Sequence, residues 1–154
     1  TTENNTFNIA QLIDSTTDLL NLNSTKKQIF IENNIDRNIE LIADKNMVEA
    51  VFRNLISNAI KYIPTESTIN ISSETKNGYY TFCVADNGEG VQQQFIIDFF
   101  SKKTNHNKSN LDKFRGMGLL MCKDFMERNN GEIWLESQKE KGSKFYLQFP
   151  NNHV

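Results

Sequence analysis

Hydrophobic residues recur at three- and four-residue spacing in three segments of this chain, residues 9–20, 47–63 and 119–126. Asn8 and Asp44 stand ahead of the first two segments, where a side-chain oxygen can cap the first turn of a helix. The pattern therefore predicts three amphipathic helices, and the apolar face of each needs a partner surface.

Residue types that stop helices follow two of these segments. Pro64 comes directly after the second, and a proline interrupts the hydrogen bonding of a helix. The pair Asn130-Gly131 follows the third, and both residue types favour the left-handed conformation of a C-terminal cap. We therefore expect the second helix to end at Pro64 and the third at Asn130-Gly131.

Shorter apolar runs between these helices predict strands. Asn77-Gly78 marks a hairpin turn between the third and fourth runs, and Gly142 a turn between the last two. The first two runs are rich in isoleucine and are predicted to form a pair. The six predicted strands are 28–32, 37–43, 69–71, 79–85, 132–137 and 144–149.

The order of these elements predicts an α/β fold, a two-layer sandwich in which three helices cover one face of a mixed sheet. A length of 154 residues predicts a single domain over residues 1–154. Residues 91–115 lack a sustained period, and their middle is polar, so we expect a long loop there.

The composition argues against several classes of protein. Lys and Arg total 17 against 19 Asp and Glu, a net charge of −2, which argues against a basic face for nucleic acid. Apolar runs stay well below the roughly 18 residues of a membrane span, and we expect a soluble chain. Cys83 and Cys122 are too few for a disulfide framework or a zinc cage, which fits a reducing, cytosolic setting.

The first candidate site lies on the second predicted helix. Asn54 and Asn58 are four residues apart, and Lys61 and Tyr62 continue the same stripe. An amide oxygen is a hard ligand suited to Mg²⁺, and a nearby lysine would neutralise phosphates. With 21 asparagines in the chain, however, solvated polar residues on a helix explain the spacing equally well.

The second candidate is Asp86-Asn-Gly88-Glu-Gly90, where an apolar strand stops. Aspartate followed by glycine two and four residues later is expected by chance only about 0.02 times in this composition. A tight turn would explain the glycines but not the aspartate. At the end of a strand, the Asp86 carboxylate could accept a hydrogen bond from an exocyclic amine such as that of adenine.

The third candidate is Gly116-Met117-Gly118-Leu119, at the start of the third predicted helix. Unpaired N–H groups at a helix start attract anions, and glycines let a phosphate approach the backbone. Two spaced glycines are also ordinary turn residues.

These segments resemble the catalytic and ATP-binding domain of bacterial sensor histidine kinases, in the GHKL superfamily with its Bergerat fold. Residues 54–62 resemble the asparagine box of that family, and residues 86–90 and 116–119 its first two glycine boxes. Residues 141–145 match the third glycine box. Residues 91–115 would then be the ATP lid, with Phe99 or Phe100 in the phenylalanine box.

The resemblance implies ATP and Mg²⁺ as cofactors and a role for each matched residue. Asn58 would bind Mg²⁺, Lys61 and Asn54 would lie near the phosphates, and Tyr62 would lie against the base. Asp86 would bind the adenine amine, and Ser143 would assist it through water. The matched residues expected to line the nucleotide site are Gly88, Gly90, Val91, Gly116, Met117, Gly118 and Leu119.

One residue favours phosphoryl transfer over hydrolysis. By resemblance, the branches that hydrolyse ATP carry a glutamate four residues before the metal-binding asparagine, as base for water. Here that residue is Asn54, whose amide cannot take a proton. An ATPase or serine kinase of the same superfamily is one alternative, which Asn54 disfavours. A degenerate nucleotide-binding or interaction module is another, because Phe114 stands where the family has a further glycine.

The phosphoacceptor would lie elsewhere. His106 and His153 lack the helical, acidic surroundings of the family's phosphoacceptor site. The resemblance implies a dimerisation and histidine phosphotransfer domain upstream of this chain, a homodimeric parent protein and a response regulator as partner. It also implies a place on the cytoplasmic side of a membrane-anchored bacterial sensor.

Overall fold

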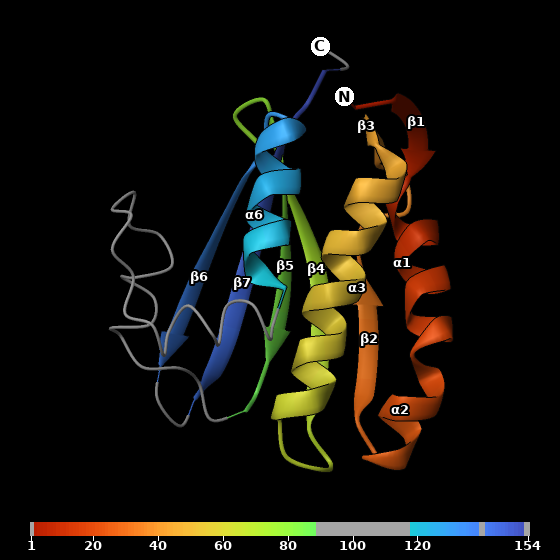
Figure 1. Cartoon of the computed structure of the whole chain (residues 1–154), viewed down its shortest axis with the longest axis vertical. Coiled ribbons are helices and arrows are strands. Elements are labelled where there is room, and N and C mark those ends of the chain that lie inside the picture. Colours follow the sequence, from red (N-terminus) through yellow and green to blue (C-terminus); the bar gives the residue numbers. More distant parts are fainter. Residues whose placement is uncertain (1, 89–117, 139–140, 153–154) are drawn as a thin grey trace.

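The computed structural model describes residues 2–88, 118–138 and 141–152, so the predicted loop 91–115 lies outside the described residues. In that part of the chain, no helix is both long and apolar enough to cross a membrane. The elements, shown in Figure 1, are β1 (Asn4–Asn8), α1 (Ile9–Leu19), α2 (Asn21–Lys26), β2 (Phe30–Asn34), β3 (Glu40–Asp44), α3 (Lys45–Tyr62), β4 (Thr68–Lys76), β5 (Tyr79–Asp86), α6 (Leu119–Arg128), β6 (Glu132–Gln138) and β7 (Gly142–Pro150).

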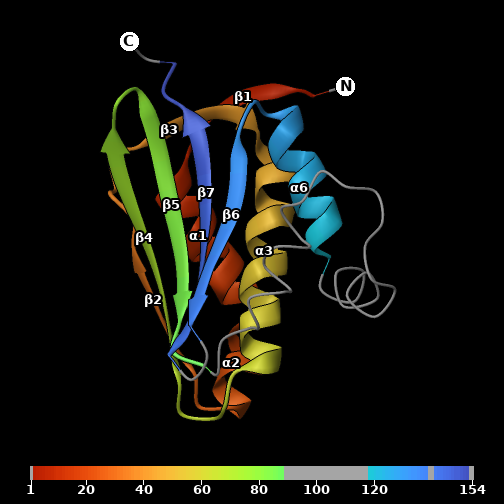
Figure 2. The ribbon, with the colours of Figure 1, turned by 90° about the vertical axis from the view of Figure 1, so that its left-hand side faces the viewer.

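The main sheet has five strands in the order β2-β4-β5-β7-β6. Strand β2 runs parallel to β4, and the other neighbours are antiparallel, so the sheet is mixed. The helices α1, α3 and α6 lie side by side on one face of this sheet, as Figures 1 and 2 show from two sides. The predicted two-layer α/β sandwich is therefore confirmed.

The predicted pairing of the first two strands was wrong. Both strands exist, but β2 pairs with β4, and β3 pairs with β1 in a separate two-stranded sheet. Strand β1 was not predicted at all, because only Phe7 among its five residues is buried. The short helix α2 was also missed, since its sequence is polar and only Ser24 is buried.

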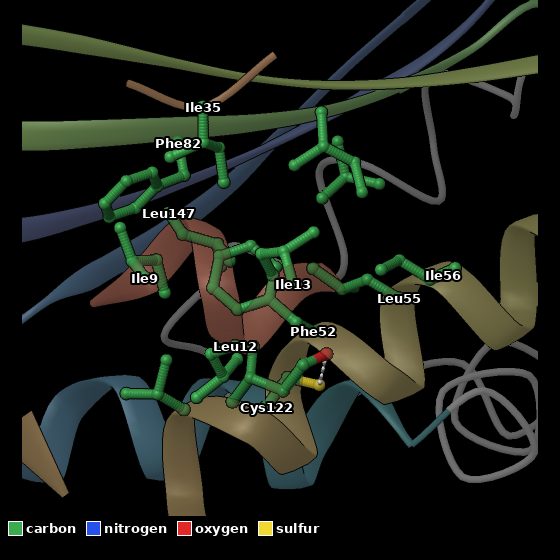
Figure 3. Packing of buried hydrophobic residues seen from close by; sticks show 14 of the residues in the cluster. Ile9, Leu12, Ile13, Ile35, Phe52, Leu55, Ile56, Phe82, Cys122 and Leu147 are labelled. Carbon is green, nitrogen blue, oxygen red and sulfur yellow. Dashed lines mark hydrogen bonds between the residues drawn. The ribbon is translucent and has the colours of Figure 1, made fainter. Parts of the chain in front are cut away.

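The core lies between the helical layer and the sheet (Figure 3). The rings of Phe52 on α3 and Phe82 on β5 meet edge to face, with centroids 6.0 Å apart, and the Phe149 ring lies 5.9 Å from that of Phe82. All three side chains are fully buried. Because aromatic contacts of this kind fix relative orientation as well as bury area, they hold α3 against the centre of the sheet.

Both predicted N-caps are confirmed. Asn8 Oδ1 accepts a hydrogen bond from the Gln11 N–H (2.9 Å), and Asp44 Oδ1 accepts one from the Met47 N–H (3.2 Å). The caps fix where α1 and α3 begin, and Asp44 thereby sets which residues of α3 face the sheet.

The predicted end of α6 at Asn130-Gly131, with a left-handed cap, is confirmed. Asn130 takes the left-handed conformation, with φ of 59°, and the Gly131 N–H donates to the Met126 carbonyl (2.8 Å). These are the features of a Schellman cap in which asparagine supplies the left-handed residue. Gly131 is required for space instead, because a Cβ there would lie 2.5 Å from the Gln148 carbonyl oxygen.

Candidate functional site

The polar stripe of α3 is present as the sequence predicted. Asn54 and Asn58 are half-buried, and Asn58 Nδ2 donates to Asn54 Oδ1 over 2.9 Å. Lys61 and Tyr62 follow in the last turn, both exposed, with Lys61 Nζ 5.2 Å from the centroid of the Tyr62 ring. The opposite face of α3 is buried in the core, so the stripe cannot turn away from its position.

Asp86 is the last residue of β5 and lies opposite Ser143 of β7 in the antiparallel register. Burial raises the pKa of the Asp86 carboxyl above its ordinary value. The backbone N–H groups of Gly88 and Ser143 oppose this by favouring the charged form, and the Gly88 N–H lies 2.9 Å from Asp86 Oδ1. The site therefore holds a carboxylate at a sheet end where water is partly excluded.

Gly88 lies against the end of α3. A Cβ at this position would lie 2.7 Å from Cγ2 of Ile63 and 3.1 Å from Asp86 Oδ1. Ile63 is the C-cap residue of α3, so its side chain joins the last turn of that helix to the turn that follows Asp86. Beside it, Asn87 Oδ1 accepts a hydrogen bond from the Thr68 N–H (3.0 Å), which anchors the same turn to β4.

Gly118 brings the start of α6 to the asparagine stripe. It is the N-cap of α6 with φ of 67°, and a Cβ there would collide with the side-chain amide of Asn54. Only glycine has both the required conformation and the required space. Leu119, the next residue, is fully buried in the core.

Gly142 and Ser143 hold the other side of Asp86. Gly142 has φ of 98°, and a Cβ there would collide with the carbonyl oxygen of Asp86. Ser143 is buried, with its Oγ 3.0 Å from Ser137 Oγ, and Ser137 Oγ donates to the Gly142 carbonyl over 3.1 Å. These contacts fix the backbone on which Asp86 is presented.

The described structure thus places Gly88 and Gly118 against α3. A third segment, at Gly142 and Ser143, lies against Asp86. The sequence alone did not identify Ile63, Asn87 or Ser137, whose contacts are made across elements and leave no local pattern. The predicted site residues Gly90, Val91, Gly116 and Met117 lie outside the described residues, as do Phe99 and Phe100.

The donor groups of the site fit a magnesium ion that is also coordinated by the phosphates of a ligand. Within residues 2–88, 118–138 and 141–152, no group of three or more His, Cys, Asp or Glu side chains could cage a metal. The Asn58 amide, anchored through its nitrogen to Asn54, offers a neutral oxygen of the kind that Mg²⁺ accepts. Such a site needs the ligand's own oxygens to complete the coordination.

The fold and these segments agree with a known protein family. Residues 43–153 match the family described as "Histidine kinase-, DNA gyrase B-, and HSP90-like ATPase". The chain belongs to this family, which confirms the resemblance drawn from its sequence motifs.

Two curated proteins are similar to this chain over most of its length. The chain is 37% identical over 111 residues to "Phytochrome-like protein Cph1" of a Synechocystis strain, covering 71% of this chain and 15% of that protein. It is 28% identical over 151 residues to "Sporulation kinase C" of Bacillus subtilis, covering 94% of this chain and 33% of that protein. The chain therefore spans a third or less of these two relatives.

A solved structure of the catalytic domain of histidine kinase ThkA, free of nucleotide, has the same fold. It superimposes with a TM-score of 0.81 at 24% identity, covering 97% of this chain and 96% of that one. Another structure shows ThkA in complex with the response regulator protein TrrA, with a TM-score of 0.78.

Proposed function

We propose that this chain is the catalytic and ATP-binding domain of a sensor histidine kinase, which binds Mg-ATP and donates its γ-phosphoryl group to a histidine. The observation that carries the proposal is the gathering of Asp86, Gly88 and Gly118 around the Asn54–Tyr62 stripe of α3. Family membership, the relative named "Sporulation kinase C" and the solved catalytic domain of histidine kinase ThkA support the same interpretation. We also propose that residues 1–154 form this one domain.

In this proposal, Asp86 selects the base. Its carboxylate accepts a hydrogen bond from the exocyclic amine of adenine. A purine that lacks this donor is rejected because the half-buried carboxylate would lose a charged hydrogen bond without regaining full hydration. Ser143 assists through a water molecule, and Tyr62 lies against the base. The raised pKa of Asp86 is the expected cost of keeping such a group partly out of water.

The phosphates lie along α3 toward the start of α6. Asn58 holds the magnesium ion, which neutralises charge on the phosphates when bound. Lys61 and Asn54 contact the phosphate oxygens, and the N–H groups at the start of α6 add donors there. Asn54 cannot act as a base for water, so the γ-phosphoryl group is kept for an imidazole acceptor.

The proposed roles of the remaining site residues are supported by the match of their motifs to those of the family. We propose that Gly90, Val91, Gly116, Met117 and Leu119 line the nucleotide through backbone groups. Residues 91–115 would form a lid over it.

The proposed parent protein supplies the other participants. The phosphate acceptor is a histidine on a dimerisation and phosphotransfer domain, and the parent is a homodimer. A response regulator receives the phosphoryl group next. The solved complex of histidine kinase ThkA with response regulator protein TrrA supports this kind of partner. The domain acts on the cytoplasmic side of a membrane-anchored sensor.

The test is a titration of the chain with ATP, ADP and GTP, with and without Mg²⁺. We expect ATP and ADP to bind and GTP to bind far more weakly. Asp86→Ala should weaken ATP and ADP alike, because the base is common to both. The matched control is Asp18→Ala, which removes an exposed carboxylate from α1 and should change nothing.

A second pair of measurements separates the metal role. Asn58→Ala should weaken ATP binding in the presence of Mg²⁺ and lose its effect when Mg²⁺ is removed. An equal effect with and without Mg²⁺ would contradict the assignment of Asn58 to the metal. Failure of the unaltered chain to bind ATP at millimolar concentration would instead favour an interaction module that kept the fold.

A further inference from the structure

Lys27 caps the C-terminal end of α3, although it belongs to a distant part of the chain. Its Nζ donates to the carbonyl oxygens of Ile60 (2.6 Å), Lys61 (3.2 Å) and Ile63 (2.6 Å). An ammonium group has three N–H donors, and all three are used here. Carbonyl groups at the end of a helix have no partner within it, and a cation there also complements the helix dipole.

The backbone around Lys27 holds its side chain at this position. The Lys27 carbonyl accepts a hydrogen bond from the Glu66 N–H (3.1 Å), and the Phe30 N–H donates to the Ser67 carbonyl (3.1 Å). The chain between α2 and β2 is thereby tied on both sides to the loop that follows α3. Lys27 is half-buried in this connection, in contrast to the exposed Lys26 beside it.

The end of α3 that Lys27 caps carries part of the candidate site. Lys61 and Tyr62 project from this last turn, and Ile63 packs against Gly88 next to the Asp86 carboxylate. A displacement of the Ile63 backbone would therefore move both the phosphate-facing turn and the contact that supports Asp86. The three hydrogen bonds of Lys27 oppose this displacement.

We propose that Lys27 is a positioning residue for the nucleotide site, holding the last turn of α3 against the turn at Asp86 and Gly88 so that both face the ligand together. The inference rests on the proposed nucleotide-binding function. Lys27 itself does not touch the nucleotide. It sets the affinity through the fraction of molecules in which the end of α3 is ordered.

The size of the effect follows from this fraction. Without the ammonium group, the three carbonyls lose their donor, and the last turn of α3 opens part of the time. The apparent dissociation constant rises in inverse proportion to the fraction that remains competent to bind. A cation at a helix end and charged hydrogen bonds both stabilise the last turn of α3. From the usual size of these two contributions, we predict that their loss lowers the affinity about three- to ten-fold.

The test compares Lys27→Met, Lys27→Arg and the control Lys26→Met. Methionine keeps an unbranched stem but removes the charge and the donors. Dissociation constants for ADP and Mg-ATP are measured at a temperature at which circular dichroism shows every variant fully folded. We expect Lys27→Met to weaken both nucleotides about three- to ten-fold, Lys27→Arg to restore most of the affinity, and Lys26→Met to match the unaltered chain.

Hydrogen exchange supplies a readout that does not depend on nucleotide. The Ile63 N–H donates to the Ala59 carbonyl over 3.0 Å in the last turn of α3. In Lys27→Met without ligand, this amide should exchange faster, while amides in the middle of β5 stay protected. An unchanged exchange rate at Ile63 would overturn the proposal.

The outcomes distinguish this inference from the function on which it rests. A lower unfolding temperature with unchanged dissociation constants would make Lys27 a purely structural residue and overturn the proposal. If the unaltered chain bound no nucleotide, the proposed function would fail instead. In an Ile63→Ala background, the effect of Lys27→Met on affinity should shrink, because the contact that transmits it is gone.

Discussion

The contact between Gly118 and Asn54 predicts a specific failure when Gly118 is changed to alanine. The φ of 67° alone costs an alanine about 1–2 kcal/mol. The new Cβ would also collide with the Asn54 amide, whose Cγ and Oδ1 both lie 2.7 Å from the position it would take. If the amide moves away, the hydrogen bond from Asn58 is lost, at about 0.5–1.5 kcal/mol. The free energy of unfolding should fall by about 1.5–3.5 kcal/mol.

Gly78→Ala is the matched control for this change. Gly78 has φ of 80°, but nothing lies within 4 Å of the Cβ it would gain, so the variant carries the backbone strain without a collision. Urea unfolding followed by circular dichroism should therefore show a smaller loss for Gly78→Ala. Affinity for nucleotide should fall only in Gly118→Ala, because only that variant disturbs the Asn54–Asn58 pair.

A double variant tests the collision directly. Asn54→Ala removes the atoms that the new Cβ at position 118 would meet, so Gly118→Ala should cost less in that background, by about 1 kcal/mol. Equal losses for Gly118→Ala and Gly78→Ala, or additive losses in the double variant, would refute the proposed contact between α6 and the asparagine stripe.

Three further predictions concern the buried side chains of Asn129 and Cys122 and the half-buried carboxyl of Asp86. Asn129→Ala should lower the free energy of unfolding by about 1–3 kcal/mol, against little change for the exposed Asn46→Ala, because Asn129 Oδ1 accepts the buried Asp44 N–H over 2.8 Å. Burial raises the pKa of Asp86 in the folded state above its ordinary value of 3.8, so the stability contributed by its protonated form is complete below that value and is lost as pH rises through the folded pKa. The free energy of unfolding of Asp86→Asn, minus that of the unaltered chain, should therefore increase from pH 4 to pH 7. A difference that decreases as pH rises would contradict this prediction. Burial also raises the pKa of the Cys122 thiol to about 12, so iodoacetamide should leave Cys122 unmodified until urea unfolds the chain, as mass spectrometry of its peptides would show.

Local patterns predicted the elements that a short stretch of sequence determines. The helix over 47–63, the hairpin at Asn77-Gly78 and the caps at Asn8 and Asp44 all depend on residues close together in the chain, and all are confirmed. Apolar periodicity was sufficient there because the buried face of α3 repeats over 18 residues.

Pairing between distant strands could not be predicted in the same way. Strand β1 pairs with β3 about 36 residues later, and four of its five residues are not buried, so no alternation marks it. Strand β2 alternates only between exposed and half-buried residues, because it lies at the edge of the sheet. Its parallel partner is therefore set by the tertiary fold and not by its own sequence.

The candidate site also combines residues that a short motif marks with residues whose contacts depend on distant segments. The sequence identified Asp86, Gly118 and the asparagines of α3 as candidates, because each belongs to a short motif with unusual residue types. Ile63 and Lys27 could not be identified in this way. An isoleucine at the end of an apolar repeat and a lysine in a polar stretch are ordinary in sequence. Their contacts with Gly88 and with the end of α3 arise only once the layers are assembled.

The central claim is that a nucleotide binds at the end of the molecule where α3, β5 and the start of α6 meet. Its most direct test is a titration of isotope-labelled protein with Mg-ATP, followed by backbone NMR. We predict that the amide signals of Asn58, Gly88 and Gly118 shift strongly. Those of Trp134 and Tyr146, whose rings stack on each other on the open face of the sheet, away from the helices, should stay in place. Shifts centred on the open face, or none at millimolar Mg-ATP, would contradict the account.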